Sequence, residues 1–91
     1  MYWRITEDLL YDGTGDIPSR VGTERKHATH DEPIYNAIQV RLLDDDEIHY
    51  YTAICEEDEE SLEDLFYWAQ RDAGTTIMQT KKDGKWVDEI A

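Results

Sequence analysis

The chain has 91 residues and a formal net charge of −13, and 40% of it is hydrophobic. A chain of this length has room for one core, and its apolar fraction can fill that core, so its acidity does not by itself imply disorder. A strongly anionic protein repels bare nucleic acid and anionic membrane surfaces, which leaves cations and basic proteins as its expected charged partners.

The cellular setting is predicted from the cysteine content and the N-terminus. Cys55 is the single cysteine, so it cannot form an intramolecular disulfide, and this favours a reducing compartment. Acidic residues stand where a signal peptide needs an apolar core, and there is no run of 18 apolar residues. We therefore interpret residues 1–91 as one soluble, cytoplasmic domain with no membrane partner.

The N-terminal third predicts one strand and one long loop. In residues 2–10, Trp3 and Ile5 alternate with polar residues, which is the period of a short strand. Residues 11–33 are rich in Gly, Pro, Asp, Ser and Thr, which are turn and loop residues. A loop of this length in a small domain is typical of a functional or mobile segment.

Residues 34–43 and 47–55 are two further alternating segments, and the short polar stretch "DDDE" joins them. This pattern predicts an antiparallel hairpin with an exposed acidic tip. In the second segment, we expect the even-numbered residues from Ile48 to Ile54 to form the apolar face.

A helix is predicted over residues 61–73. Ser61 is the expected N-cap, with Asp64 three residues later in the capping-box position, and Gly74 is placed to end the helix. Four apolar side chains at helical spacing form one stripe: Leu62, Leu65, Phe66 and Ala69.

The C-terminal segments "TTIMQT" and "KWVDEI" flank "KKDG", whose Asp83–Gly84 pair predicts a second tight hairpin. We expect Trp86 in this hairpin to pack on the helix stripe through Phe66 or Leu65. The order of elements is then β-loop-β-β-α-β-β. It predicts an α+β fold, a small antiparallel sheet with one helix packed on one face.

Residues 42–70 contain eleven acidic residues and no Lys or Arg. Because this stretch has the periods of a strand and a helix, we interpret the charge as a folded acidic surface. It fits a solubilising face, a divalent-metal site or a recognition surface. A calcium loop starting at the tip would need Gly where His49 stands and Glu where Cys55 stands, which disfavours the metal alternative.

Other candidate sites are weaker. His27 and His30, with Asp31 and Glu32 beside them, have a spacing that zinc sites use, but no third ligand is fixed by the sequence. No local Ser-His-Asp or Cys-His arrangement is found in the sequence, and acidic neighbours disfavour a thiolate at Cys55. We therefore predict no enzyme activity, no catalytic residue, no bound metal and no cofactor.

The segments "VRLLDDDEIHYY" and "TTIMQTKKDGKW" resemble short acidic proteins encoded by phages and other mobile elements. The resemblance covers roughly the C-terminal half of the chain. The matching positions are Asp44, Asp45, Asp46, Tyr50, Tyr51, Thr76, Ile77, Gly84 and Trp86. Small acidic phage proteins are often inhibitors of host defence enzymes, anti-CRISPR proteins among them, and some imitate nucleic acid. The resemblance implies such a setting by analogy and no particular activity.

The leading hypothesis is a non-enzymatic protein-binding module that occludes a basic, nucleic-acid-handling groove of a partner, without binding nucleic acid itself. The predicted binding carboxylates are Asp44, Asp45, Asp46, Glu47, Glu56, Glu57, Asp58, Glu59, Glu60, Glu63 and Asp64, with Tyr51 and Trp68 as aromatic anchors. The alternatives are a housekeeping or halophile-type domain whose charge only solubilises it, and a metal protein built on His27 and His30. The oligomeric state stays open.

Overall fold

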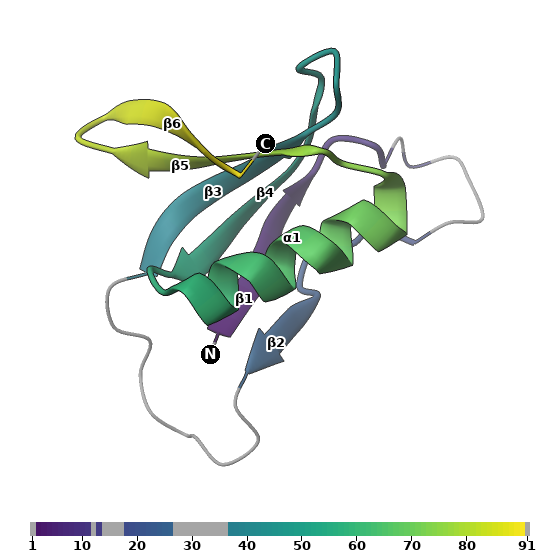
Figure 1. The fold of residues 1–91 in the computed structure, drawn as a ribbon. Coiled ribbons are helices and arrows are strands. Elements are labelled where there is room, and N and C mark those ends of the chain that lie inside the picture. Colours follow the sequence, from purple (N-terminus) through teal and green to yellow (C-terminus); the bar gives the residue numbers. More distant parts are fainter. Residues whose placement is uncertain (1, 12, 14–17, 27–36, 91) are drawn as a thin grey trace.

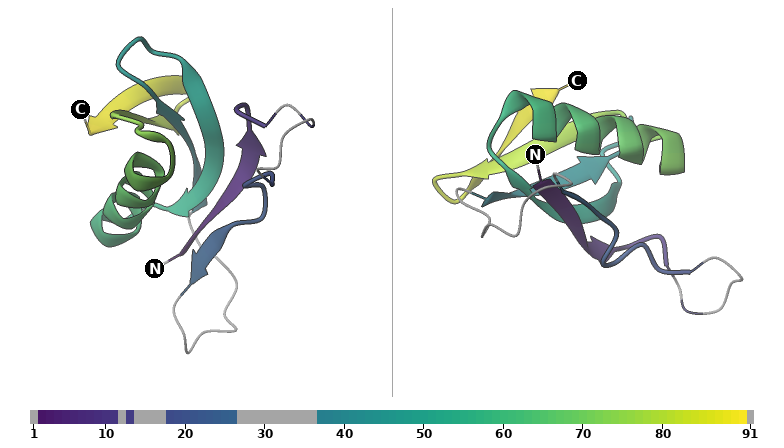
Figure 2. Two further views of the ribbon diagram at one scale, coloured as in Figure 1. Left: turned by 90° about the vertical axis from the view of Figure 1, so that its right-hand side faces the viewer. Right: turned by 90° about the horizontal axis from the view of Figure 1, so that it is seen from below.

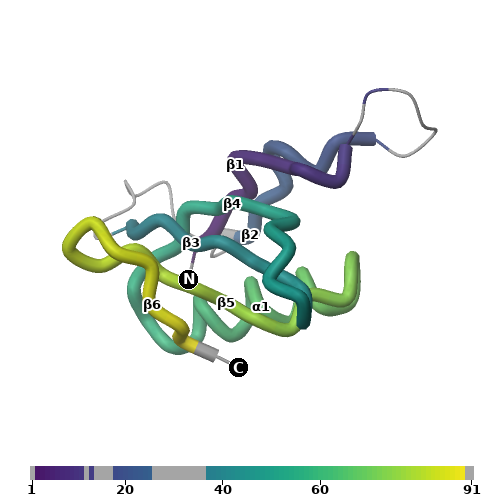
Figure 3. The backbone as a smooth tube through the Cα atoms, turned by 90° about the horizontal axis from the view of Figure 1, so that it is seen from above, coloured from purple at the N-terminus to yellow at the C-terminus, as the bar shows by residue number. Residues whose placement is uncertain are grey.

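The computed structural model describes residues 2–11, 13, 18–26 and 37–90. In this part of the chain, one helix packs against a six-stranded antiparallel sheet (Figure 1). The elements are β1 (Tyr2–Asp8), β2 (Glu24–Lys26), β3 (Ala37–Leu43), β4 (His49–Glu56), α1 (Glu59–Ala73), β5 (Ile77–Lys82) and β6 (Lys85–Ile90). The strand order is β2-β1-β4-β3-β5-β6, so the β5–β6 hairpin and the β1–β2 pair lie on opposite sides of the molecule (Figure 3). The predicted α+β class is confirmed.

The core lies between α1 and one face of the sheet (Figure 2). The sheet contributes Trp3, Ile5, Val40, Leu42, Tyr51, Ala53, Cys55 and Met78, and the helix contributes Leu65, Phe66 and Ala69. Leu62 is partly buried beside them, so the predicted helix stripe is confirmed. Burial of this one apolar stripe, rather than helix propensity alone, holds α1 on the sheet.

Part of the predicted loop over residues 11–33 is a strand. β2 pairs antiparallel with β1, with Trp3 opposite Arg25. The pairing continues beyond β2, because the Ile5 N–H donates to the Thr23 carbonyl at 2.8 Å. A three-residue edge strand of sequence "ERK" has no apolar alternation, so its sequence gave no strand signal.

The buried face of β4 is the opposite of the predicted one. Tyr51, Ala53 and Cys55 face α1 and are 2%, 0% and 0% exposed, whereas Tyr50, Thr52 and Ile54 are only partly buried. The strand has apolar side chains on both faces, so alternation alone could not choose between them. The small side chains of Ala53 and Cys55 allow a helix to lie close to the strand, and this is the face that α1 covers.

The helix begins one turn earlier than the sequence suggested. Asp58, not Ser61, is the N-cap, with φ −138° and ψ 153°, and its Oδ1 accepts from the Ser61 N–H at 2.8 Å. The Ser61 hydroxyl donates to Asp58 Oδ2 at 2.8 Å and accepts from the Tyr2 N–H at 3.2 Å. Asp and Ser cap helices equally well, so a run of acidic residues before Ser61 left the starting residue ambiguous.

Two predicted turns are confirmed. The helix ends at Gly74, whose φ of 74° is left-handed and whose N–H donates to the Gln70 carbonyl. Asp83 and Gly84 have φ values of 52° and 78°, as a two-residue type I′ hairpin loop requires.

The predicted contact of Trp86 with the helix is wrong. The Arg41 guanidinium carbon lies 4.5 Å from the centre of the Trp86 ring. Arg41 alternates along β3 with the buried Val40 and Leu42, so it lies on the sheet face away from α1. Cation–π contact draws the ring to that open face, and periodicity alone did not reveal it.

Replacing Gly84 with valine is expected to lower the free energy of unfolding by about 1–3 kcal/mol. A Cβ at this position would meet nothing within 4 Å, so the cost comes from holding a β-branched residue at φ 78° rather than from a clash. Urea denaturation measures the loss. The control is Gly84→Asn, which tolerates left-handed φ and should lose less, and equal stability of all three proteins would refute the strain.

Candidate partner-binding surface

The predicted acidic surface is divided between two ends of the molecule. We call Asp44, Asp45, Asp46 and Glu47 the tip patch, and Glu56, Glu57, Asp58, Glu59, Glu60, Glu63 and Asp64 the helix-start patch. Eight residues, 48–55, lie between Glu47 and Glu56, and seven of them belong to β4, so the chain spans roughly 25 Å there at ~3.3 Å per residue. In Figure 1, the β3–β4 tip and the start of α1 lie at opposite ends of the sheet. The expectation of one joint surface was therefore wrong.

Two of the four carboxylates in the tip patch, Asp44 and Asp45, accept hydrogen bonds within the molecule. Asp44 Oδ1 accepts from the Ile48 and Asp46 N–H groups at 2.9 and 2.8 Å, and its Oδ2 accepts from the Tyr50 hydroxyl at 3.0 Å. The hydrogen bond from Ile48, followed by those from Tyr50 and Asp46, holds the pKa of Asp44 below its ordinary value. Asp45 accepts from the Thr76 hydroxyl. Asp44 thus organises the turn, contrary to the expectation that the whole tip is exposed.

Two carboxylates of the helix-start patch also have structural roles. Asp58 caps α1. Asp64 Oδ2 accepts from Trp3 Nε1 at 2.7 Å and lies 3.4 Å from Arg25 Nε. These contacts tie the first turns of α1 to β1 and β2, so Asp58 and Asp64 are poor candidates for partner contacts.

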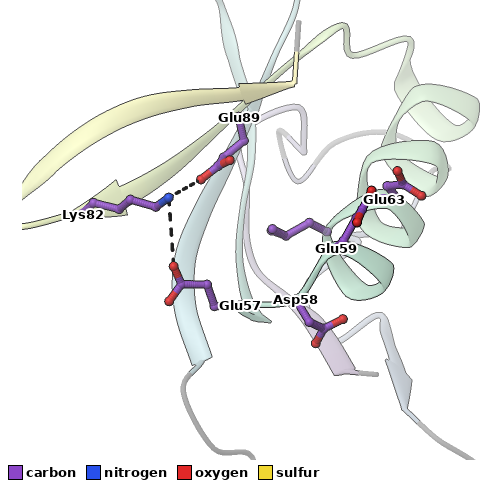
Figure 4. A pocket seen from close by; sticks show the side chains of 7 residues that line it. Glu57, Asp58, Glu59, Glu63, Lys82 and Glu89 are labelled. Atoms are coloured by element: carbon purple, nitrogen blue, oxygen red, sulfur yellow. Dashed lines mark ion pairs between the residues drawn. The ribbon is translucent and has the colours of Figure 1, made fainter.

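An open pocket of about 370 Å³ lies between the start of α1 and the β5–β6 hairpin (Figure 4). It is lined by Glu57, Asp58, Glu59, Leu62, Glu63, Lys82 and Glu89. Five carboxylates against one ammonium group make it a negatively charged hollow with an apolar wall at Leu62. Such a hollow suits a basic side chain with an aliphatic stem.

Lys82 is the cation within this pocket. Its Nζ lies 2.7 Å from Glu89 Oε1 and 4.0 Å from Glu57 Oε1. The hydrogen bond to Glu89 raises the pKa of Lys82, and the same bond lowers the pKa of Glu89, which also accepts from the Thr80 hydroxyl at 2.8 Å. The ammonium group is therefore engaged mainly with the hairpin and leaves Glu59 and Glu63 on the facing helix turn.

The outer face of α1 continues the acidic surface. Glu59, Glu60 and Glu63 are exposed and form no ion pair with any residue that the structure describes. Tyr67 follows Glu63 by one helical turn and is 53% exposed. An aromatic ring beside exposed carboxylates is a combination typical of protein interfaces.

Neither predicted aromatic anchor is exposed, because Tyr51 is buried and Trp68 is partly buried against the core. Tyr51 is 2% exposed and its hydroxyl donates to Asp72 Oδ2 at 2.6 Å, so it offers no ring to a partner. Burial, followed by this hydrogen bond, raises the pKa of Tyr51. The Trp68 ring packs 5.3 Å from the Trp3 ring and 5.4 Å from the Tyr51 ring. Of the three aromatic residues in α1, Tyr67 is the exposed one, and its spacing from Glu60 and Glu63 was the signal for it.

In the described residues, no group of three or more His, Cys, Asp or Glu side chains is placed to hold a metal ion. His27 and His30 lie outside the described residues. In the same described ranges, no helix is long and apolar enough to cross a lipid bilayer.

Comparisons of the chain with protein-family models, with curated proteins and with solved structures found no match. The resemblance to short acidic phage proteins therefore stays a prediction. A functional proposal for this chain therefore rests on the geometry and charge of the described residues.

Proposed function

We propose that this chain is a non-enzymatic protein-binding module whose helix-start patch docks onto a basic, nucleic-acid-handling groove of a partner protein. The observation that carries the proposal is the exposed row of Glu59, Glu60 and Glu63, bordered by the acidic pocket on one side and by Tyr67 along the helix. The action is occlusion without turnover. Its setting is the cytoplasm, with a phage-encoded inhibitor of host defence as the case that the resemblance favours.

Charge density supports a partner that normally holds nucleic acid. Glu59, Glu60 and Glu63 are three exposed carboxylates within five consecutive residues of α1, and the exposed Glu57 precedes them. Helical residues rise ~1.5 Å each, and duplex DNA carries one charge per ~1.7 Å of its axis. A groove that attracts phosphates therefore also attracts this segment.

A purely solubilising role remains the second candidate, and one observation favours it: part of the acidity needs no partner to explain it. Asp44 holds the β3–β4 turn, Asp58 caps α1 and Asp64 accepts a hydrogen bond from Trp3. These contacts do not account for Glu60 and Glu63, so these two exposed residues separate the candidates.

The test compares two double charge reversals of equal size. Glu60→Lys with Glu63→Lys changes the helix-start patch, and Asp46→Lys with Glu47→Lys changes the tip patch. A partner is captured from a lysate of the source cells on the immobilised protein, identified by mass spectrometry and titrated. We expect the helix-start reversal to weaken binding by about 100-fold or more and the tip reversal by less than about 3-fold, because like charges facing each other across an interface cost several kcal/mol.

Salt and competitor DNA give independent readouts. Binding should weaken from 0.1 M to 1 M salt, as the Debye length falls from ~10 Å to ~3 Å, and duplex DNA should compete for the partner. Both variants must keep the wild-type circular dichroism spectrum. Of the four substitutions, only Glu60→Lys lies in the first helical turn, where a lysine costs about 1 kcal/mol or less. Binding that is indifferent to salt and to the helix-start reversal would leave the solubilising role.

A further inference from the structure

The outer edge of β6 is the feature that the proposed partner binding does not use. In the described part of the chain, β6 pairs with β5 on one side and is last in the strand order. The other edge strand, β2, has three residues, whereas β6 has six. A long edge presents a row of N–H and C=O groups that can pair with a further strand.

The hairpin turn determines which groups on β6 point outward. Residues that flank a two-residue loop form a hydrogen-bonded pair, and here Lys82 lies opposite Lys85. Alternation then directs the backbone groups of Lys85 and Val87 towards β5. Those of Trp86 and Asp88 point to the free edge.

A second copy that pairs antiparallel must place outward-pointing residues opposite outward-pointing residues. A two-fold axis at Val87 meets this condition, with Trp86 of each copy opposite Asp88 of the other. An axis at Asp88 meets it too, but it places two Asp88 carboxylates face to face. The next permitted axis, at Trp86, pairs Lys85 with Val87 and leaves fewer residues matched.

The axis at Val87 also matches the side chains on the α1 side of the sheet. Lys85 of each copy lies opposite Glu89 of the other, and Val87, which is 42% exposed, lies opposite itself. Glu89 is held on this side by its contacts with Thr80 and Lys82. Opposite charges and apolar side chains in facing positions each stabilise a strand pair.

We propose that the protein forms a weak two-fold dimer through antiparallel pairing of β6 with β6 of a second copy, centred on Val87. The two sheets then continue as one, with both helices on the same face. A contact of two short strands is smaller than a standard interface, so the dimer is weak. Each copy carries a charge of −13, so salt should strengthen the dimer by screening the repulsion, whereas it weakens the proposed partner binding.

The first experiment is sedimentation equilibrium over roughly 10 µM to 1 mM protein, where a weak interface dissociates. Asp88→Pro removes an edge N–H without touching the β5–β6 ladder, and its control, Asp88→Ala, keeps the N–H. We expect proline to weaken the dimer by about 10-fold or more and alanine by less than about 3-fold, in proportion to the backbone bonds lost.

A second pair of variants tests the register. Lys85→Glu places Glu against Glu89 of the other copy at both ends of the contact, whereas Lys81→Glu makes the same change of net charge on β5. We expect the first to weaken the dimer and the second to leave it nearly unchanged. In NMR hydrogen exchange, the Trp86 and Asp88 amides should gain protection as protein concentration rises.

Three outcomes would overturn the dimer. One is a monomer at every concentration in high salt, and another is a dimer that persists unchanged in Asp88→Pro. The third is pairing of β6 with a foreign chain in the absence of self-association. None of them bears on the helix-start patch, so the dimer and the proposed function fail separately.

Discussion

Replacing Trp3 with alanine is expected to lower the free energy of unfolding by about 3–5 kcal/mol, which is a large part of the stability of a small domain. Trp3 is 1% exposed, its ring packs 5.3 Å from the Trp68 ring, and its Nε1–H donates to Asp64 at 2.7 Å. Alanine leaves a cavity between β1 and α1 and an Asp64 carboxylate without its buried donor. Urea denaturation monitored by far-UV circular dichroism measures the loss.

Trp86→Ala is the matched control, since it deletes the same atoms from the open face of the sheet. That ring is partly exposed and stacks on Arg41 at 4.5 Å, a contact worth about 0.5–1 kcal/mol at an exposed site. The Trp3 variant should therefore lose several times more stability than the Trp86 variant. Comparable losses would mean that the contact between β1 and α1 is not the centre of the core.

The second large effect is a loss of stability at alkaline pH that depends on Cys55. Burial, followed by the nearby carboxylates of Asp58, Glu56 and Asp64, raises the pKa of the Cys55 thiol to about 12. In the unfolded chain, the thiol ionises at its ordinary pKa of ~8.5. Above that pH, ionisation therefore stabilises the unfolded state but not the folded state. The stability that the neutral, buried thiol contributes to the folded state is fully present below pH ~8.5 and is lost as pH rises towards about 12.

Between pH 8 and pH 10, we expect the free energy of unfolding to fall by about 2 kcal/mol through this group alone. Urea denaturation at several pH values measures the slope, and Cys55→Ala should have a flatter one. Above pH 10, Tyr51 adds an effect of the same sign because burial raises its pKa as well, so the comparison is confined to the lower range. Identical slopes in both proteins would show that the thiol ionises freely in the folded state.

The parts of the fold that the sequence predicted are those with a local cause. The turn at Asp83–Gly84 and the helix end at Gly74 follow from residues that accept left-handed φ, and the buried face of α1 follows from its apolar period. β2 was missed because three charged edge residues acquire a strand conformation only through their partner β1. The position of α1 over the sheet, which no local pattern contains, decided the buried face of β4.

The candidate site was predicted in composition but not in layout. The sequence showed where the acidic residues stand in the chain, but their separation by the length of β4 depends on topology. Their role in partner binding stays a prediction. The error at Tyr51 has the same origin as the error in the face of β4, since an outward face for Tyr50 means an inward face for Tyr51. Helical periodicity could have placed Tyr67 on the outer face of α1, and its exposure distinguishes it from the buried aromatic residues.

The distance between the tip patch and the helix-start patch makes them electrostatically independent. Roughly 25 Å of β4 is more than two Debye lengths at 0.1 M salt, so charges at one end are screened from the other. Charge changes at the two ends should therefore add without coupling. If a partner docks on the helix start as proposed, the β3–β4 turn neither attracts nor repels it, so the carboxylates of that turn are constrained by the turn alone.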